Sequence, residues 1–173
     1  ILIDSSGLDG GLIKAAREIN EGLVFHVFQR AAEHIKDKNI SPENANIFIS
    51  GFAFKGHPET DDMRGSPALQ LLDFFKNSQI KNIYGHDFVV KQEYIEKLGV
   101  KSCSIEEGFK TADVLIFMNN HKKYNDISVG NLAESMKENA LLFDGWQIFS
   151  DKIKDLNINY ESIGFKKTKN RLA

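Results

Sequence analysis

The sequence predicts an α/β protein with a doubly wound, mostly parallel sheet preceded by a long α-helix. Apolar residues recur at spacings of three and four over residues 12–35, which is typical of a helix. Short apolar runs and helical stretches then alternate along the chain, as in βαβ units. One run, residues 114–118, is wholly apolar, which favours a central strand covered on both faces.

The first predicted element is the long helix. Its apolar stripe consists of Leu12, Ala16, Ile19, Leu23, Val27, Ala31 and Ile35. Other apolar residues widen this stripe beyond what packing on one small domain requires, so we expect a second partner surface. That partner is either a second copy of the chain or another domain. Gly22 indicates a kink or a close helix approach, because glycine costs about 1 kcal/mol relative to alanine within a helix.

A polar connection over residues 37–45 leads into the alternating part of the chain. The predicted strands cover residues 46–50, 81–85, 114–118, 140–143 and 158–163, with a short strand just before residue 105. The predicted helices cover residues 67–77, 93–98, 105–110 and 129–137. Gly99 is expected to end the second of these helices. This order predicts a Rossmann-like sheet, in which ligands lie beyond the carboxyl ends of the strands.

The most informative motif is the first strand with its following loop, NIFISGFAFKGHPETDDMRGSP. Ser66 is a typical N-cap, and Pro67 suits the first helical position. We therefore expect free N–H groups at this helix end to face the loop. Together with Lys55 and Arg64 they favour a phosphate or pyrophosphate. The loop over residues 119–124 is expected to converge on the same place.

These segments resemble the UDP-glucose/GDP-mannose dehydrogenase family. GFAFK, Asp62-Met63-Arg64 and Ser66-Pro67 resemble the opening of the family's C-terminal, UDP-sugar-binding domain. ADVLIFMNNHKKY, from residue 112, and LLFDG, from residue 141, resemble later segments of that domain in the same order. LIKAAREIN, from residue 12, resembles part of the central helix through which these enzymes dimerise.

The resemblance implies the end of the dimerisation region over residues 1–40 and a nucleotide-sugar-binding domain over residues 41–173. Family members use NAD to oxidise the C6 alcohol of a nucleotide-sugar to a carboxylate. This chain contains no GxGxxG motif, and its one cysteine, Cys103, does not lie in a Gly-rich segment. We therefore expect the NAD-binding domain and the catalytic cysteine to be absent here, Cys103 to be inert, and the fragment to be inactive alone.

By resemblance, Phe54 and Lys55 hold the nucleotide-sugar, and Arg64 contacts NAD that is bound mainly by the absent domain. The residues themselves leave alternatives. Lys55 is otherwise an ordinary surface lysine. Arg64 has a planar fork suited to pyrophosphate, yet it also suits a salt bridge with Asp61 or Asp62 that fixes the loop.

Trp146 follows an Asp-Gly turn after which many family members place a substrate-contacting arginine. It either stacks on a base or sugar or covers the end of the sheet. His121 stands where the family branch acting on N-acetylated UDP-sugars often has a histidine, which favours UDP-N-acetylmannosamine over UDP-glucose. Neither His57 nor His121 has metal-ligand spacing, so no metal site is expected.

Composition limits the partners. A formal net charge of −2 gives no general attraction to nucleic acid, and the basic run at residues 166–169 is interpreted as a solvated tail. No apolar run approaches the ~18 residues that span a bilayer. A single cysteine excludes a disulfide framework and is consistent with the cytoplasm. The expected partners are a UDP-sugar and a second copy, bound through the Leu12–Ile35 helix.

A stand-alone nucleotide-binding or dimerisation module without catalysis is the alternative function. The sequence starts without an initiator methionine, which favours a piece of a longer protein. The two functions can be distinguished by the upstream reading frame. If it encodes a GxGxxG strand and a cysteine in a Gly-rich loop, the chain is part of a dehydrogenase and not a stand-alone module.

Overall fold

The computed structural model describes residues 11–169, so the irregular start expected before the first helix lies outside the described residues. The strands are β1 (Asn46–Ser50), β2 (Asn82–His86), β3 (Lys101–Ser102), β4 (Val114–Phe117), β5 (Leu141–Asp144), β6 (Asn159–Ser162) and β7 (Phe165–Lys167). The helices are α2 (Gly11–Asp37), α3 (Pro67–Asn77), α4 (Gln92–Lys97), α5 (Ile105–Thr111) and α6 (Val129–Glu134), with the 3-10 helix η1 (Lys122–Asp126).

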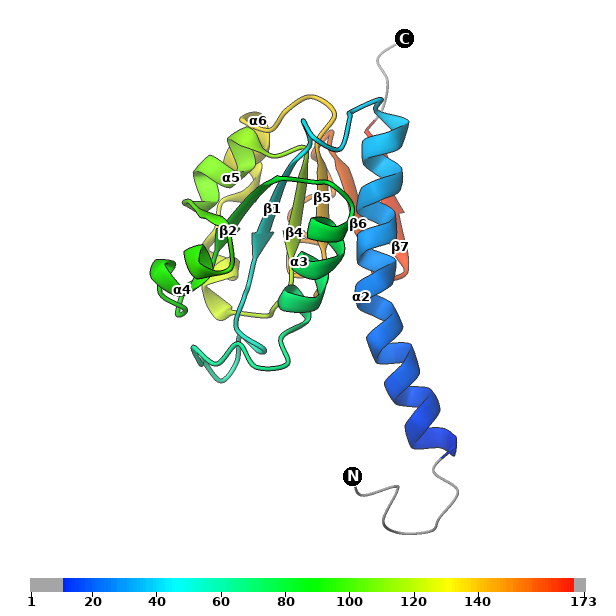
Figure 1. The fold of residues 1–173 in the computed structure, drawn as a ribbon. Helices are drawn as coiled ribbons and strands as arrows, with labels where there is room; N and C mark the ends of the chain where they lie inside the picture. Colours follow the sequence, from blue (N-terminus) through cyan, green and yellow to red (C-terminus); the bar gives the residue numbers. More distant parts are fainter. Residues whose placement is uncertain (1–10, 170–173) are drawn as a thin grey trace.

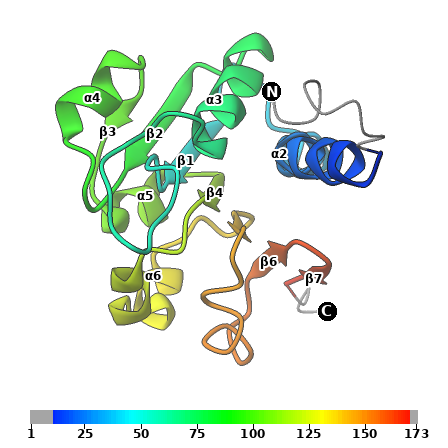
Figure 2. The ribbon, with the colours of Figure 1, turned by 90° about the horizontal axis from the view of Figure 1, so that it is seen from below.

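The strands form one seven-stranded sheet in the order β3-β2-β1-β4-β5-β6-β7 (Figure 1). Strands β1 to β6 pair in parallel, and β7 runs antiparallel to β6. Helices α2 and α3 cover one face, while α5 and α6 cover the other (Figure 2). The chain changes direction across the sheet between β1 and β4, so the predicted doubly wound, mostly parallel fold is confirmed.

The core is divided by the sheet into two clusters, because successive strand residues point to opposite faces. Ile47 and Ile116 pack with α2 and α3, whereas Phe48, Leu115 and Phe117 pack with α5 and the segment after β5. All four residues of β4 are buried, which confirms the central strand that the apolar run predicts. The carboxyl ends of β1, β4 and β5 therefore lie between two well-packed layers.

Helix α2 packs on the sheet through its second half alone. Val27, Ala31 and Ile35 are buried, but Leu12 is 86% exposed and Ile19 is 67% exposed. The first half of the helix extends past the end of the sheet (Figure 1). The apolar stripe of the sequence is thus one continuous helix that is only partly covered within the described residues.

The kink or close approach expected at Gly22 is not found. The helix continues through this position, and a Cβ added there would meet nothing within 4 Å.

An ion pair fixes α2 to the edge of the sheet. Arg30 donates from Nε and Nη2 to the two carboxylate oxygens of Glu161 on β6, both at 2.8 Å. Lys166 on β7 lies 3.0 Å from Oε1 of the same carboxylate. The Glu161 side chain is 6% exposed, so this contact is screened less than a surface pair.

Glu161→Gln is expected to lower the free energy of unfolding by about 1–2 kcal/mol at pH 7, because Arg30 then loses its charged partner. Burial raises the pKa of Glu161, but hydrogen bonds and charges of Arg30 and Lys166 outweigh it and leave the pKa lowered. The stabilisation is therefore complete above the ordinary glutamate pKa of about 4.3 and is lost as the pH falls through the lower folded-state value.

Urea denaturation of both proteins between pH 7 and pH 3 measures this effect. The exposed Glu33→Gln, which removes another partner of Arg30, is the control and is expected to change stability by under about 0.5 kcal/mol. A difference between wild type and Glu161→Gln that stays constant down to pH 3 contradicts this account.

Two regions differ from the sequence-based expectation. The basic run is not a solvated tail, because Lys166 and Lys167 belong to β7, which follows a turn at Gly164 with φ +80°. Lys167 donates to the carbonyl oxygens of Ile153 and Lys154 at 2.7 and 2.6 Å. Helix α6 ends at Glu134, before the expected end at residue 137.

Beyond the end of α6, the ammonium group of Lys137 lies 2.7 Å from Oδ1 of Asp113, next to the start of β4.

Candidate functional site

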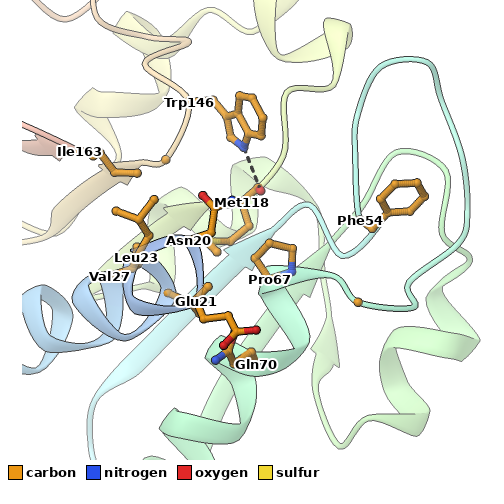
Figure 3. A pocket seen from close by; sticks show the side chains of 13 residues that line it. Asn20, Glu21, Leu23, Val27, Phe54, Pro67, Gln70, Met118, Trp146 and Ile163 are labelled. Carbon is orange, nitrogen blue, oxygen red and sulfur yellow. Dashed lines mark hydrogen bonds between the residues drawn. The ribbon is translucent and has the colours of Figure 1, made fainter. Parts of the chain in front are cut away.

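A cavity of about 520 Å³ lies beyond the carboxyl ends of the central strands (Figure 3). Helix α2, where it begins to leave the sheet, and the neighbouring start of α3 line one side of it. The loops after β1, β4 and β5 complete it. The lining includes Leu23, Val27, Pro67, Met118 and Ile163, which make it largely apolar. This is the expected position for a ligand in a doubly wound sheet.

Phe54 and Trp146 both line this cavity, although they come from different loops. Phe54 is 40% exposed and Trp146 is 54% exposed, so both rings are accessible to a ligand. Trp146 donates from Nε1 to the carbonyl oxygen of Met118 at 3.0 Å (Figure 3). Two of the residues predicted for the site are therefore brought to one cavity, and the indole is oriented by the end of β4.

Lys55 lies next to this cavity and not in its lining. It is half-buried, and its Nζ lies 5.0 Å from the centre of the Phe54 ring. The cation therefore rests on an aromatic face. Within residues 11–169 Lys55 forms no ion pair with a carboxylate, so its charge is available to an anionic ligand.

The guanidinium of Arg64 binds Asp62, and Arg64 is not among the residues that line the cavity. Nε lies 3.0 and 3.1 Å from the two carboxylate oxygens, and Nη2 lies 2.7 Å from Oδ2. The hydrogen bonds from Arg64 lower the pKa of Asp62 to about 2. The salt-bridge alternative of the sequence is thus what the structure contains, with the Arg64 side chain 91% exposed.

The start of α3 differs from the prediction. Ser66 is the N-cap as predicted, and its Oγ accepts the N–H of Ala68 at 3.2 Å. The N–H of Leu69 donates to the carbonyl oxygen of Ser66 at 3.1 Å, and Pro67 has no N–H. The expectation of free N–H groups at this helix end is therefore wrong, because the cap and the proline leave none over the first three residues. Of the two cations in this loop, Lys55 is the one without a carboxylate partner within residues 11–169.

Asp87 shapes the loop after β1 and was not singled out from the sequence. Its Oδ2 accepts the N–H of Ala53 at 3.0 Å, and its Oδ1 accepts the N–H groups of Val89 and Val90 at 2.8 and 3.0 Å. In dinucleotide-binding domains, an acidic residue after the second strand binds a ribose hydroxyl. Here backbone donors occupy both oxygens. An aspartate directly after a strand is the only sequence signal for this role.

The loops after β1 and β4 meet as expected. The N–H of Gly56 donates to Oδ1 of Asn120 at 3.1 Å. Asn119 fills the space beside Gly51, which has φ +99° and where an added Cβ would lie 2.7 Å from the Asn119 side chain. The loop that carries Lys55 is thus seated on the end of β4.

Cys103 is buried, and its pKa is raised to about 11 by burial and by the nearby Glu107 carboxylate. A pKa this far above neutral favours the protonated thiol, which is consistent with the inert role predicted for Cys103. Among the described residues, no three His, Cys, Asp or Glu side chains gather in a metal-binding arrangement. Over the same part of the chain, no helix combines the length and apolar character that a membrane span requires.

Residues 48–151 match the model of the UDP-glucose/GDP-mannose dehydrogenase family, UDP binding domain. The chain belongs to this family. It is 28% identical to the UDP-N-acetyl-D-mannosamine dehydrogenase of Pyrococcus horikoshii, over 87% of this chain and 33% of that protein. It is 24% identical to the NDP-N-acetyl-D-galactosaminuronic acid dehydrogenase of Ralstonia solanacearum, over 76% of this chain and 30% of that protein.

Two solved structures share the fold. The UDP-D-ManNAc dehydrogenase of Pyrococcus horikoshii superposes with a TM-score of 0.75 at 28% identity, over 94% of this chain and 35% of that chain. The NDP-N-acetyl-D-galactosaminuronic acid dehydrogenase of Methanosarcina mazei Go1 shares the fold, with a TM-score of 0.71 at 18% identity, over 98% of this chain and 34% of that chain. The chain thus spans about a third of the length of these relatives.

Proposed function

We propose that this chain is the C-terminal portion of an NAD-dependent nucleotide-sugar 6-dehydrogenase. In this proposal residues 41–173 bind a UDP-sugar whose C6 alcohol the whole enzyme oxidises to a carboxylate. Residues 1–40 form the end of the dimerisation region. The observation that carries the proposal is the position of an aromatic-rimmed cavity at the carboxyl ends of the strands, within a sheet that matches the family's UDP binding domain.

The chemistry of the site fits a nucleoside diphosphate sugar. Phe54 and Trp146 offer flat apolar surfaces to a base or a sugar, which stack on aromatic rings. Lys55, free of carboxylate partners within residues 11–169, supplies a point charge to a phosphate beside them. We assign Phe54, Lys55 and Trp146 to substrate binding on this basis.

We infer that the sugar is N-acetylated, of the UDP-N-acetylmannosamine type rather than the UDP-glucose type. The relatives from Pyrococcus horikoshii and Ralstonia solanacearum both carry an N-acetylated sugar in their names. Such an enzyme supplies a sugar acid for polysaccharide biosynthesis and works in the cytoplasm, and both of these roles are part of the proposal.

NAD accepts the hydride in oxidations of this kind. The sequence of this chain contains no GxGxxG motif of the kind that holds a dinucleotide. We therefore propose that NAD binds mainly to a domain outside this chain, and that Arg64 contacts it from this side. For that contact, the Arg64 guanidinium must either bind NAD and Asp62 at the same time or give up its hydrogen bonds to Asp62.

The fragment alone is proposed to be inactive, because the one cysteine of the chain is buried and protonated. A homodimer through the Leu12–Ile35 helix is also proposed. The exposed apolar residues Leu12, Ile13 and Ile19 on the first half of α2 support it, since large apolar side chains gathered on a surface often mark an interface.

UDP is expected to change the fluorescence of Trp146, the single tryptophan of the chain, because its indole borders the cavity. Lys55→Ala is expected to raise the Kd for UDP by about tenfold, the effect of losing one charge-assisted hydrogen bond. The urea concentration at the unfolding midpoint should be the same for Lys55→Ala and for wild type. Calorimetric titration of both proteins with UDP, NAD+ and UDP-sugars measures the Kd values without relying on tryptophan fluorescence.

The control is Lys110→Ala, which removes an exposed lysine from α5 on the opposite face of the sheet. It should leave the Kd unchanged. The assignment of this site is wrong if UDP binds wild type and Lys55→Ala with equal affinity, or if an unrelated ligand binds wild type more tightly than UDP does.

A further inference from the structure

His121 is almost completely buried beneath the loop that carries Lys55. Its side chain is 2% exposed, and its ring lies against Phe88, with centroids 4.8 Å apart and an interplanar angle of 32°. Within residues 11–169, its Nε2 is the one buried side-chain nitrogen or oxygen that lacks a hydrogen bond. A buried polar atom without a partner is costly, so its surroundings need a physical explanation.

The tautomer of His121 follows from its other ring nitrogen. Nδ1 accepts the backbone N–H of Lys123 at 3.2 Å, where His121 is the N-cap of η1. A backbone N–H always donates, so Nδ1 carries no proton and Nε2 carries it in the neutral ring. The Nε2–H group is therefore a donor held in a fixed direction by packing and by the cap.

The neighbour of this donor is Glu59 of the Lys55 loop. Its Oε1 lies 3.1 Å from Nε2 of His121, although the angle is not that of a hydrogen bond. The Glu59 side chain is 58% exposed, so much of it is in contact with solvent. It lies between the solvent and the buried nitrogen of His121. No other carboxylate is within 4 Å of this nitrogen among the described residues.

A second contact lies beside the first. Gly56, the residue after Lys55, packs directly on the backbone of His121, where an added Cβ would lie 2.0 Å from the His121 nitrogen. Its N–H donates to Oδ1 of Asn120. The part of the loop that follows Lys55 is thus held at two points, by Gly56 on the backbone and by Glu59 on the imidazole.

We infer that His121 is a positioning residue of the nucleotide-sugar site, which holds the Lys55 loop in its binding position through Glu59. The imidazole does not touch the ligand; it acts by limiting where Lys55 is placed. The inference rests on the proposed function for its consequence in ligand binding, but the contact between His121 and Glu59 is testable without any ligand. It makes Glu59 and His121 one energetic unit.

The ligand-free test is amide hydrogen exchange over residues 52–62 of the chain. Glu59→Ala is expected to raise exchange in this loop by about fivefold or more, because local opening becomes easier. Glu59→Gln keeps an oxygen acceptor for Nε2–H and should restore protection. Asp61→Ala is the matched control, since Asp61 is an exposed acid in the same loop, and it should leave exchange unchanged.

The ligand test is a double-mutant cycle read as the Kd for UDP. Glu59→Ala and His121→Asn are each expected to raise the Kd by about threefold to tenfold, and the double variant should add nothing further. The asparagine side chain of the His121→Asn variant can still accept the Lys123 N–H through its amide oxygen, but it does not reach Glu59. A merely structural role of His121 gives additive effects and no recovery by Glu59→Gln.

The outcomes separate the two ideas. If Glu59→Ala and Asp61→Ala give the same exchange, or if the effects on UDP are additive, the positioning role is overturned. If wild type does not bind UDP while Glu59→Ala still loosens the loop, the proposed function fails and the contact stands.

Discussion

Asp144→Ala is expected to lower the free energy of unfolding by about 3–4 kcal/mol, because it leaves buried donors without acceptors. The Asp144 carboxylate is completely buried at the end of β5. Its Oδ2 accepts the N–H of Phe149 at 2.7 Å and the hydroxyl of Tyr160 at 3.0 Å, and its Oδ1 accepts the N–H of Trp146 at 3.1 Å. Phe149 and Tyr160 are themselves buried, so water cannot replace the lost acceptor.

Two variants separate the hydrogen bonds from the charge. Asp144→Asn can keep a carbonyl oxygen for Phe149 and Tyr160 and lose only the bond to Trp146, so a loss of about 1 kcal/mol is expected. Tyr160→Phe removes one donor and should cost about the same. Urea denaturation measures all three, and the fluorescence of Trp146 reports whether the turn has moved. If alanine and asparagine at this position cost the same, the buried donors are not what makes Asp144 important.

Gly56→Ala is expected to destabilise the protein by about 2–3 kcal/mol and to weaken UDP binding, because the added methyl group overpacks the contact between two loops. The added Cβ would lie 2.0 Å from the backbone nitrogen of His121 and 2.5 Å from its Cα. Backbone atoms cannot rotate away as a flexible side chain does, so one of the two loops must shift. Because Gly56 follows Lys55, the shift moves the proposed phosphate-binding cation.

The measurements are urea denaturation and the Kd for UDP. The matched control is Gly22→Ala on α2, where the Cβ would meet nothing within 4 Å. It is expected to stabilise the helix by up to about 1 kcal/mol, from helix propensity alone. A Gly56→Ala protein with wild-type stability and wild-type affinity would falsify the close seating of the two loops.

Much of the fold follows from local patterns. The wholly apolar run of β4 and the Ser66-Pro67 start of α3 were predictable, because both depend on residues close together in the sequence. Strand β7 was not predictable from the sequence, because it is only three residues long and is largely exposed. It forms because the turn at Gly164 returns the chain to the edge of β6.

The sequence suggested residues for the candidate site but not their arrangement. Phe54 and Trp146 line one cavity, and their contact with a ligand stays a prediction. Lys55 was expected as a cation, and it lies beside that cavity on the Phe54 ring. The free N–H groups of α3 were wrongly expected, because the cap is satisfied by Ser66 itself. Asp87 gave no signal that distinguishes a ligand-binding acid from a loop anchor.

The order of amino acids alone determined the class of fold, the long helix α2 and the residues that we propose for a nucleotide-sugar site. Those properties depend on periodicity and on short motifs, and both are formed by residues that lie close together in the sequence. Only the tertiary structure decided which half of α2 is covered, that Phe54 and Trp146 line one cavity, and that Glu59 meets His121. Such pairings depend on side-chain direction and burial, which are set when distant segments pack together.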